Sequence, residues 1–423
     1  MDPTGLAPRR AAHRLLMQVT EESRLLPEAI GAGTLDALGP EDRARAQRLA
    51  TETLRMLDRA DRALKPHLRQ MPAAHVLNAL RLGTVELGQG AAAHGVVNAC
   101  VEIVGRNPRT SRLKGLTNAV LRKMAALGPE GWEALPVPLI PGWLRQPLVA
   151  AWGRPTVQAI EAVQARTPPL DLTARSDPEA VAHATGGTLL PTGSIRVQAP
   201  GQVSALPGFA AGDWWVQDAA AAIPVRLLGD IAGRTALDLC AAPGGKTLQL
   251  AAAGSRVTAI DASASRLERV RENLDRTGLS AEVAQGDAFE TTGQWDVVLL
   301  DAPCSATGTL RRHPDLAYAR DGSEFGALID QQTAMIDHAL TLVKPGGRLL
   351  FCTCSLLPDE GEVQIEEALD RHRDLATDRA ALTAAGVNPD WITEEGGLRL
   401  RPDHWADRGG MDGFYAAVLT KTA

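Results

Sequence analysis

Two cysteines carry the chemistry that this sequence suggests. Cys304 lies in the run Asp-Ala-Pro-Cys-Ser at 301–305, and Cys354 lies in the run Cys-Thr-Cys-Ser at 352–355. An apolar stretch typical of a buried parallel strand precedes each run. The carboxyl ends of parallel strands form the ligand-binding edge of an open α/β sheet. Because a thiolate can form a covalent bond to a substrate carbon, two thiols at this edge indicate covalent catalysis.

A glycine-rich turn follows the first strand of the carboxyl-terminal half. Glycines at a strand–helix junction let a ligand approach the backbone, next to a helix N-terminus that favours negative charge. The ending Gly-Lys-Thr is similar to a phosphate-binding P-loop, but Cys240 stands where that motif needs its first glycine, which excludes a nucleoside triphosphatase. The turn consists of Cys240, Ala241, Ala242, Pro243, Gly244, Gly245 and Lys246.

Two aspartates extend this turn into a predicted cofactor site. Asp261 ends the second strand, about twenty residues after the turn begins, where an acid commonly binds ribose hydroxyls. Asp287 follows the third strand and could reach the amino edge of an adenine. A turn and two acids on consecutive strand ends predict a nucleoside-type cofactor.

The elements that must position these residues alternate regularly after residue 234, which predicts a doubly wound, mostly parallel, Rossmann-like α/β sheet. Residues 9–127 show the three- and four-residue apolar spacing of helices, and prolines cluster between 136 and 155 as in a linker. We therefore expect a helical domain at 1–130, a small α+β subdomain at 131–230 and a Rossmann-like domain at 231–423. Strands are expected at 235–240, 256–261, 281–286, 295–301, 347–353 and 414–420, and helices at 244–253, 263–278, 325–343 and 359–372.

Charge is distributed unevenly along the chain. The 423 residues carry a net charge of −6, yet residues 1–130 hold 19 Lys and Arg against 13 Asp and Glu. A basic front on an acidic body favours a nucleic-acid partner. Five cysteines lack disulfide-rich spacing, and no apolar run is long enough for a signal peptide or a membrane span. These features predict a cytoplasmic protein with no membrane partner.

Together the motifs resemble the RNA cytosine-5 methyltransferases that use S-adenosylmethionine. In particular they resemble the bacterial small-subunit (16S) ribosomal RNA methyltransferase B family, also called RsmB, Sun or Fmu. The helical front, with Val97-Asn98 and residues 117–122, resembles the RNA-binding factor NusB, and this fusion points to group B. The matching runs are 238–247, 261, 286–288, 301–310, 312–315 and 352–355 with Pro358.

The resemblance implies a role for each site residue. Cys354 would be the nucleophile, Cys304 would release the product, and Asp301 would lie near both the target base and the cofactor. The middle subdomain would be an RRM-like RNA-positioning module, and the protein a monomer that needs no metal. The residues implied in binding S-adenosylmethionine are Cys240, Ala241, Ala242, Pro243, Gly244, Gly245, Lys246, Asp261, Arg266, Asp287 and Asp301.

The chemistry of cytosine explains why such residues are needed. Carbon 5 is a weak nucleophile until a thiolate adds at carbon 6 and makes it enamine-like. An acid near N3 and the amino group, here Asp301, would stabilise the charge that develops. Cys304, or a water that it orients, would then help remove the carbon 5 proton. The base must be unstacked to reach the site, and Arg311, Arg312 and His313 are expected to hold its flanking phosphates.

The sequence departs from the family at positions expected to affect RNA positioning rather than catalysis. Gly361 follows Glu360 where the family has asparagine, and Ala99 follows Asn98 where an acid is usual. Residues 170–173, Leu-Asp-Leu-Thr, replace a more basic, asparagine-containing run.

Other functions remain as alternatives. The RNA could be a transfer RNA or another RNA, or the chain could be a non-catalytic RNA-binding assembly factor that keeps the fold. A methyltransferase for exocyclic amines or protein is disfavoured, because Asp-Ala-Pro-Cys replaces the Asn/Asp-Pro-Pro-aromatic run of such enzymes. A zinc site built from Cys240, Cys304, Cys352 and Cys354 is disfavoured by their spacing. Burial as a small apolar side chain is the expectation for Cys100 and Cys352.

Overall fold

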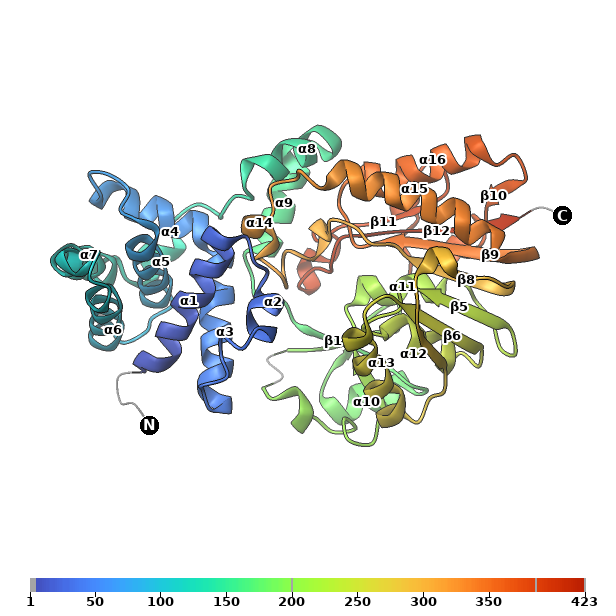
Figure 1. Ribbon diagram of the computed structural model, residues 1–423, viewed down its shortest axis with the longest axis horizontal. Helices are drawn as coiled ribbons and strands as arrows, with labels where there is room; N and C mark the ends of the chain where they lie inside the picture. The colour runs from blue at the N-terminus through green and yellow to red at the C-terminus, as the bar shows by residue number, and fades with distance from the viewer. Residues whose placement is uncertain (1–4, 199–200, 385, 422–423) are drawn as a thin grey trace. The chain divides into compact units, whose positions relative to one another are not determined.

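The computed structural model describes residues 5–198, 201–384 and 386–421, and the chain forms two compact units. The helical unit comprises Met1–Thr167 together with Leu310–Gly322, and the α/β unit comprises Pro168–Thr309 and Ser323–Ala423. Figure 1 shows the helices of residues 1–167 in blue to green, the segment of residues 310–322 in orange, and the sheets of the second unit in green to red. The sequence predicted three domains, at 1–130, 131–230 and 231–423. That division into smaller domains stays a prediction.

The helical unit is built around α5 (Ala74–Gly88), whose side chains are buried on nearly all sides. It packs against α1, α6 and α7. The apolar faces of α5, α6 and α7 form one core, whereas that of α1 forms a second core with α2 and α3. Ala99 is buried in the first of these cores, which explains why an apolar residue stands there instead of an acid. The remaining elements of the unit are α1 (Leu6–Glu22), α2 (Leu26–Gly31), α3 (Pro40–Arg55), α4 (Leu57–Leu64), η1 (Lys65–His67), α6 (Ala93–Arg106), η2 (Ser111–Leu113), α7 (Lys114–Glu133), α8 (Gly142–Trp152), α9 (Arg154–Gln164) and α14 (Leu316–Ala319).

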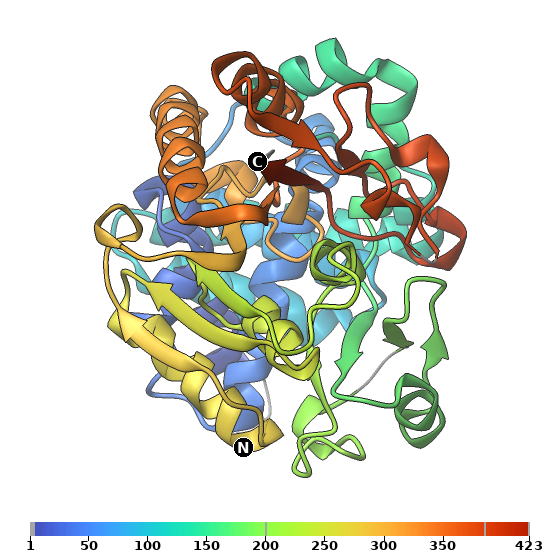
Figure 2. The same cartoon turned by 90° about the vertical axis from the view of Figure 1, so that its right-hand side faces the viewer.

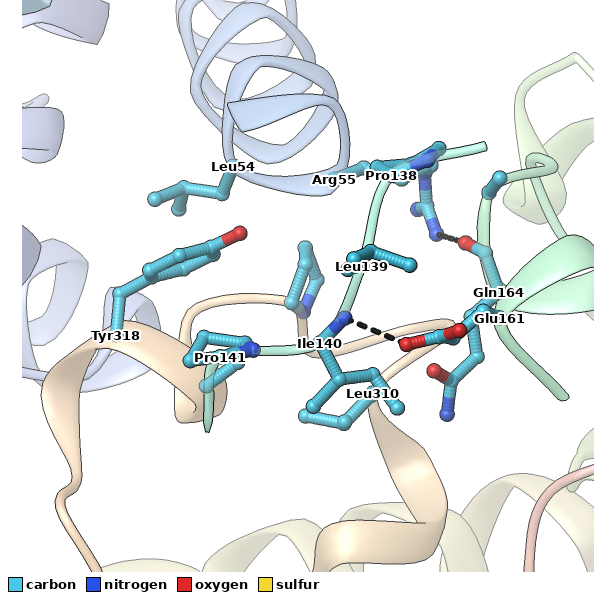
Figure 3. A pocket seen from close by; sticks show the side chains of 13 residues that line it. Leu54, Arg55, Pro138, Leu139, Ile140, Pro141, Glu161, Gln164, Leu310 and Tyr318 are labelled. Atoms are coloured by element: carbon cyan, nitrogen blue, oxygen red, sulfur yellow. Dashed lines mark hydrogen bonds between the residues drawn. The ribbon is translucent and has the colours of Figure 1, made fainter. Parts of the chain in front are cut away.

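The segment Leu310–Gly322 joins the helical unit although it follows Cys304 in the sequence. The backbone N–H of Leu26 donates to Asp315 Oδ2 at 2.8 Å, and the indole N–H of Trp143 donates to the carbonyl of Ala317 at 3.1 Å. Figure 3 shows Leu310 and Tyr318 of this segment lining a pocket beside Leu54, Arg55 and residues 138–141.

This packing corrects one expectation. Arg311 is only 1% exposed, and its carbonyl accepts a hydrogen bond from Arg55. The prediction that Arg311 holds a phosphate of the RNA is therefore wrong, because a buried guanidinium has no access to the nucleic-acid backbone.

The α/β unit begins with a small antiparallel sheet of strand order β2-β3-β1-β4. Asp171 on β1 accepts two 2.7 Å hydrogen bonds from Arg196 on β3, and both side chains are buried. The Leu-Asp-Leu-Thr run is thus a structural strand whose acid is already paired. The elements are β1 (Leu170–Ala174), α10 (Pro178–Thr185), β2 (Thr188–Leu189), β3 (Ile195–Val197), η3 (Val203–Ala205) and β4 (Trp214–Val216).

The large sheet has the strand order β10-β12-β9-β8-β5-β6-β7, with β11 paired to β12. The strands from β9 to β7 are parallel, whereas β12 is antiparallel to β9. The sheet grows in one direction from β5 to β7 and in the other from β8, so the carboxyl ends of β5 and β8 flank a topological switch point. The strands are β5 (Thr235–Leu239), β6 (Arg256–Asp261), β7 (Glu282–Gln285), β8 (Trp295–Asp301), β9 (Val343–Thr353), β10 (Leu375–Thr377), β11 (Leu398–Leu400) and β12 (Phe414–Lys421).

Helices cover both faces of this sheet, which confirms the predicted doubly wound fold (Figures 1 and 2). Alternate residues of each strand serve the two cores: Leu237 packs with α15 and α16, and Ala236 packs with α11 and α12. The other elements are α11 (Ala219–Arg226), α12 (Gly245–Ala252), α13 (Ala264–Thr277), η4 (Ala288–Glu290), η5 (Thr307–Thr309), α15 (Phe325–Thr341), η6 (Pro358–Glu360), α16 (Glu362–Arg371), η7 (Ala381–Thr383), η8 (Pro389–Trp391) and η9 (Ala406–Arg408).

Within residues 5–198, 201–384 and 386–421, none of the helices has both the length and the apolar character that crossing a bilayer requires. The same ranges contain no group of three or more His, Cys, Asp or Glu side chains that could hold a metal ion.

Candidate active site

The structure brings the two cysteines together at the carboxyl edge of the large sheet. Cys304 follows the end of β8, Cys354 follows the end of β9, and their Sγ atoms lie 3.5 Å apart. Both thiols are free and half-buried. The parallel pairing of β8 with β9 places these two strand ends side by side, as the sequence pattern requires.

Backbone contacts join the two cysteine segments. The N–H of Ala302 donates to the carbonyl of Cys352 at 3.0 Å, and the N–H of Gly308 donates to the carbonyl of Cys354 at 2.9 Å. A Cβ at position 308 would overlap the backbone of Gly413, so only glycine allows this close approach. The spacing between the two sulfurs is therefore fixed by the main chain on both sides.

A buried ion pair lies next to the sulfurs. Lys246 extends from the first turn of α12, is 8% exposed, and its Nζ donates to Asp301 Oδ2 at 2.7 Å. The ammonium also lies 4.8 Å from the centre of the Phe414 ring. Burial disfavours the charged amine, but the charges of Asp301 and of the nearby cysteines outweigh burial and raise the pKa of Lys246. Lys246 is thus a permanent cation beside Asp301.

Two of the thiols are held in the neutral form. A hydrogen bond with Cys354, burial, and the negative charges of Cys354 and Glu360 raise the pKa of Cys304 well above its ordinary value. Burial, followed by the charge of Asp301, raises the pKa of Cys352, whose Sγ lies 3.5 Å from Asp301 Oδ1. Cys352 is fully buried, as expected.

The glycine-rich turn lies at the end of β5, next to this cluster. Cys240 and Gly244 both have positive φ angles, 62° and 103°, so the chain reverses sharply before α12 begins. Burial and the charges of Asp301 and Asp261 raise the pKa of Cys240 to about 12, which keeps that thiol neutral. The predicted cofactor residues from 240 to 246 therefore form one turn, which lies at the topological switch point of the sheet.

Asp238 is the buried acid under this turn. Its Oδ2 accepts a 2.6 Å hydrogen bond from Thr247, whereas its Oδ1 is buried and has no hydrogen-bond partner among the described residues. Burial raises the pKa of Asp238 to about 7, and the Thr247 hydrogen bond opposes this shift.

Asp261 at the end of β6 stabilises the turn directly. Its two carboxylate oxygens accept hydrogen bonds from the backbone N–H groups of Ala242, at 3.0 Å, and Ser263, at 2.9 Å. Arg266 lies 3.7 Å from Asp261 and donates to the carbonyl of Ala242. The structure thus assigns Asp261 and Arg266 a structural function, and their contact with a ribose stays a prediction.

Asp287 lies apart from the cysteine cluster. It is exposed beyond the end of β7 and accepts a hydrogen bond from the N–H of Phe289 at 2.9 Å. Phe289 itself is 42% exposed, which is unusual for so large an apolar side chain. A role for Asp287 at an adenine stays a prediction.

Sequence reasoning missed the residues that surround Cys304. Glu360 is fully buried and accepts hydrogen bonds from Ser305 and from Gln332, which is also fully buried. Little in the sequence marks Glu360, which is one of three acids between residues 359 and 362. Gln332 lies on α15 and gave no signal at all, because its partners come from distant segments.

The departure at Gly361 has a packing explanation. A Cβ at this position would collide with Arg399 and with the Tyr415 ring. Arg399 fills this space, pairs with Glu362 and donates to the carbonyl of Ser355, directly after Cys354. Glycine at 361 thus makes room for an arginine that supports the Cys354 segment.

The doubly wound sheet, with a glycine turn after its first strand and acids on the next strand ends, defines a Rossmann-like methyltransferase. Comparison with known proteins gives the family. The family model described as 16S rRNA methyltransferase RsmB/F matches residues 226–420, and the NusB family model matches residues 6–126. The chain is 35% identical over 443 residues to ribosomal RNA small subunit methyltransferase B of Erwinia tasmaniensis, covering 97% of each chain. It belongs to this family, and the resemblance seen in the sequence is confirmed.

Solved structures show the same fold. The crystal structure of PH0851 covers 100% of this chain and 99% of its own, with a TM-score of 0.75 and 21% identity. A methyltransferase homologue from Pyrococcus horikoshii covers 66% of this chain and 94% of its own, with a TM-score of 0.54 and 24% identity. At this level of identity the likeness concerns the fold alone.

Proposed function

We propose that this enzyme transfers a methyl group from S-adenosylmethionine to carbon 5 of a cytosine in 16S ribosomal RNA. The reaction passes through a transient bond between Cys354 and carbon 6 of the base. The observation that carries the proposal is the pair of free thiols, 3.5 Å apart, at the sheet edge that holds the glycine turn. The family and the name of the Erwinia relative support ribosomal RNA as the substrate.

The residues at the ends of β5, β6 and β7 fit S-adenosylmethionine. Gly244 adopts a positive φ angle, and its missing Cβ makes room for Val270 of α13, so the chain turns tightly into α12 at the sheet edge. Asp261 and Asp287 supply carboxylate acceptors on successive strand ends for ribose hydroxyls and an adenine amino group. When bound, the cofactor supplies an activated methyl group, and Asp301 and Lys246 border the place where it is delivered.

The first task of the protein residues is to activate carbon 5. The Cys354 thiolate attacks carbon 6 and forms the S–C6 bond, while the electron pair of the C5–C6 double bond shifts toward N3. The Lys246–Asp301 pair is assigned to stabilising the charge that develops at N3 and the exocyclic amino group. Carbon 5 is then nucleophilic enough to accept the methyl group.

The second task is to remove the proton from carbon 5. The electron pair of the C5–H bond restores the C5–C6 double bond, the S–C6 bond breaks, and Cys354 leaves as a thiolate. The proton passes to a water that Cys304 orients, or to the Cys304 thiolate once that thiol has released its own proton to solvent. The charge of Cys354 helps keep Cys304 protonated at rest. Bonding to carbon 6 removes that charge, so the pKa of Cys304 falls when its thiolate is needed as a base.

The helical unit offers a surface for RNA phosphates. A cavity between α1 and α6 is lined by Arg10, Arg14 and Arg106, with His13 and His75 at its base. Arg10 is exposed and Arg14 donates to the carbonyl of Thr34 at 3.3 Å, and among the described residues neither forms an ion pair with an acid, whereas Arg106 pairs with Glu102. Arginines contact phosphates without reading sequence, which fits a module that positions a large RNA.

The test compares the wild-type enzyme with Cys354→Ala and Cys304→Ala on 16S ribosomal RNA and labelled S-adenosylmethionine. We expect Cys354→Ala to lose at least a thousandfold in rate, because covalent activation is removed. Cys304→Ala should remain attached to the RNA as a denaturant-resistant band. Methylation by Cys354→Ala, or ordinary turnover by Cys304→Ala, would contradict the proposal.

Bisulfite sequencing of total RNA from cells without the protein identifies the substrate. Loss of a 5-methylcytosine from 16S ribosomal RNA supports the proposal. Loss from a transfer RNA instead would favour the alternative substrate class.

A further inference from the structure

We propose that Glu360 is a positioning residue that fixes Cys304 for product release. The proposal rests on the function proposed above, since it concerns how that site holds its second cysteine. Glu360 ends the short helix η6 and is 0% exposed. No step of the reaction described so far uses this carboxyl group.

The carboxylate of Glu360 is held by donors from the Cys304 loop and from α15. Its Oε1 accepts hydrogen bonds from the N–H of Ser305, at 2.9 Å, and from Gln332 Nε2, at 3.0 Å. Its Oε2 accepts a hydrogen bond from the Ser305 hydroxyl. Both oxygens act as acceptors, which is the pattern of an ionised carboxylate, and all three donors are neutral groups.

Gln332 links Glu360 to the residue on the other side of Cys304. The same Nε2 that donates to Glu360 also donates to the carbonyl of Pro303 at 2.9 Å. Pro303 and Ser305 are the two neighbours of Cys304 in the chain. Glu360 and Gln332 thus hold the backbone on both sides of the cysteine, which leaves its Sγ little freedom to move away.

Glu360 also contacts the segment of the nucleophile. Its backbone carbonyl accepts a 2.8 Å hydrogen bond from Thr353, the residue before Cys354. Ser355, the residue after Cys354, lies 3.2 Å from the Ser305 hydroxyl, oxygen to oxygen. One buried residue therefore ties together the two loops whose sulfurs must lie within reach of the same base.

The charge of Glu360 argues that this contact does more than hold the fold together. Burying a carboxylate costs free energy that neutral donors offset only in part, and a neutral side chain could join the two loops without that cost. The charge faces Cys304, where a negative neighbour favours the protonated thiol and makes its thiolate a stronger base. The position of Glu360 thus favours proton removal at carbon 5, and its charge keeps Cys304 protonated until Cys354 has bonded to carbon 6.

The experiment replaces Glu360 by glutamine in the full-length enzyme. The variant keeps the size of the side chain, but an amide NH2 group replaces one carboxylate oxygen. This group donates hydrogen bonds and cannot accept one from Ser305 or Gln332. We expect multiple turnover to fall at least tenfold and the denaturant-resistant RNA adduct to accumulate, as in Cys304→Ala. The KM for S-adenosylmethionine should change less than about threefold, because Glu360 does not belong to the cofactor turn.

Gln364→Leu is the matched control. Gln364 is also buried, 1% exposed; its Nε2 donates to the carbonyls of Ile329, at 3.1 Å, and Asp359, at 3.4 Å, and its Oε1 accepts from the Thr333 hydroxyl. In the part of the chain that the structure describes, it makes no hydrogen bond to the Glu360 side chain or to residues 303–305. It should lose stability without accumulating adduct. A Glu360→Gln enzyme that turns over more slowly with no more adduct than Gln364→Leu would overturn the proposal.

Ser305→Ala keeps the proposal testable if Glu360→Gln does not fold. It removes the hydroxyl donor to Glu360 and keeps the backbone N–H donor, so a smaller rise in adduct is expected. Wild-type behaviour of a folded Ser305→Ala protein would then reject the assignment. Failure of Cys304→Ala to trap RNA would instead reject the underlying function, so the two failures are distinguishable.

Discussion

The two sides of the sulfur pair differ in charge although the sulfurs are only 3.5 Å apart. On the side of Cys354 lies the Lys246 ammonium, 2.7 Å from Asp301 and above the Phe414 ring. On the side of Cys304 lies the Glu360 carboxylate, whose donors are neutral. The anion favours the protonated thiol of Cys304, so two identical side chains lie in different electrostatic surroundings.

This difference explains how one fold can use two cysteines without confusing them. Sequence motifs name both residues, but only their neighbours decide which sulfur attacks and which one carries a proton. The interaction between the two sulfurs also determines which step comes first, bond formation at Cys354 or proton removal by way of Cys304. The negative charge of one raises the pKa of the other, so formation of the carbon–sulfur bond at Cys354 prepares Cys304 for the next step.

Removing the Lys246 ammonium should abolish the charge difference between the two sides of the sulfur pair. Of the predictions in this section, it has the largest expected effect on the rate of methylation. Lys246→Met keeps the apolar stem of the side chain but leaves Asp301 unpaired beside the thiols. We expect the single-turnover rate of methylation to fall at least a hundredfold, because the site loses the ammonium that pairs with Asp301 and interacts electrostatically with Cys354. Alkylation of Cys354 by iodoacetamide, followed by mass spectrometry in a Cys304→Ala background, should slow in parallel.

Lys246→Arg is the control variant. It keeps the positive charge but replaces the compact ammonium by a planar guanidinium. It should retain more alkylation than Lys246→Met while remaining slow in methylation. Equal alkylation rates in the wild type and Lys246→Met would show that the ammonium does not act on this thiol.

The sequence predicted the large sheet well where its central strands, such as β8 and β9, contain continuous apolar runs. The predicted bounds of β6 and β8 coincide with the observed ones. β9 begins at Val343 instead of 347, because its first residue pairs with Trp295 across an irregular register that no local pattern reveals. The three-residue edge strands β10 and β11 were missed, since they exist only through pairing with β12.

The site was predicted only where its residues lie on strand ends. Cys304 and Cys354 meet because adjacent parallel strands end at the same edge, which the alternation of elements already implies. Glu360 and Gln332 meet through the packing of η6 and α15 against the cysteine loops, and such contacts have no local signature. The docking of residues 310–322 in the helical unit was missed for the same reason.

A second prediction concerns the buried acid on the Lys246 side. The pKa of Asp238 is raised to about 7, so the folded protein holds a proton there that the unfolded chain releases near pH 4. The folded state binds more protons between these values, and stability therefore falls as pH rises from about 4 to 7. Asp238→Asn, which can still accept from Thr247, should lack this loss.

The measurement is the free energy of unfolding of both proteins by urea across this pH range. The difference, variant minus wild type, should increase with pH by at most about 1.4 kcal/mol per unit. It should level off above pH 7. A difference that is constant with pH would show that Asp238 titrates alike in the folded and unfolded states.

Replacing Cys352 has the smallest expected effect. It tests whether proton removal is confined to the Glu360 side of the sulfur pair. Cys352 lies two residues before the nucleophile and touches Asp301, yet it is fully buried and its pKa is raised by burial and by the charge of Asp301. Cys352→Ala removes only a weak S–H donor to Asp301, so the rate of methylation should fall less than about fivefold, with no trapped RNA. Adduct accumulation in this variant would mean that proton removal is not confined to the Glu360 side, because a thiol on the Lys246 side would then take part in it.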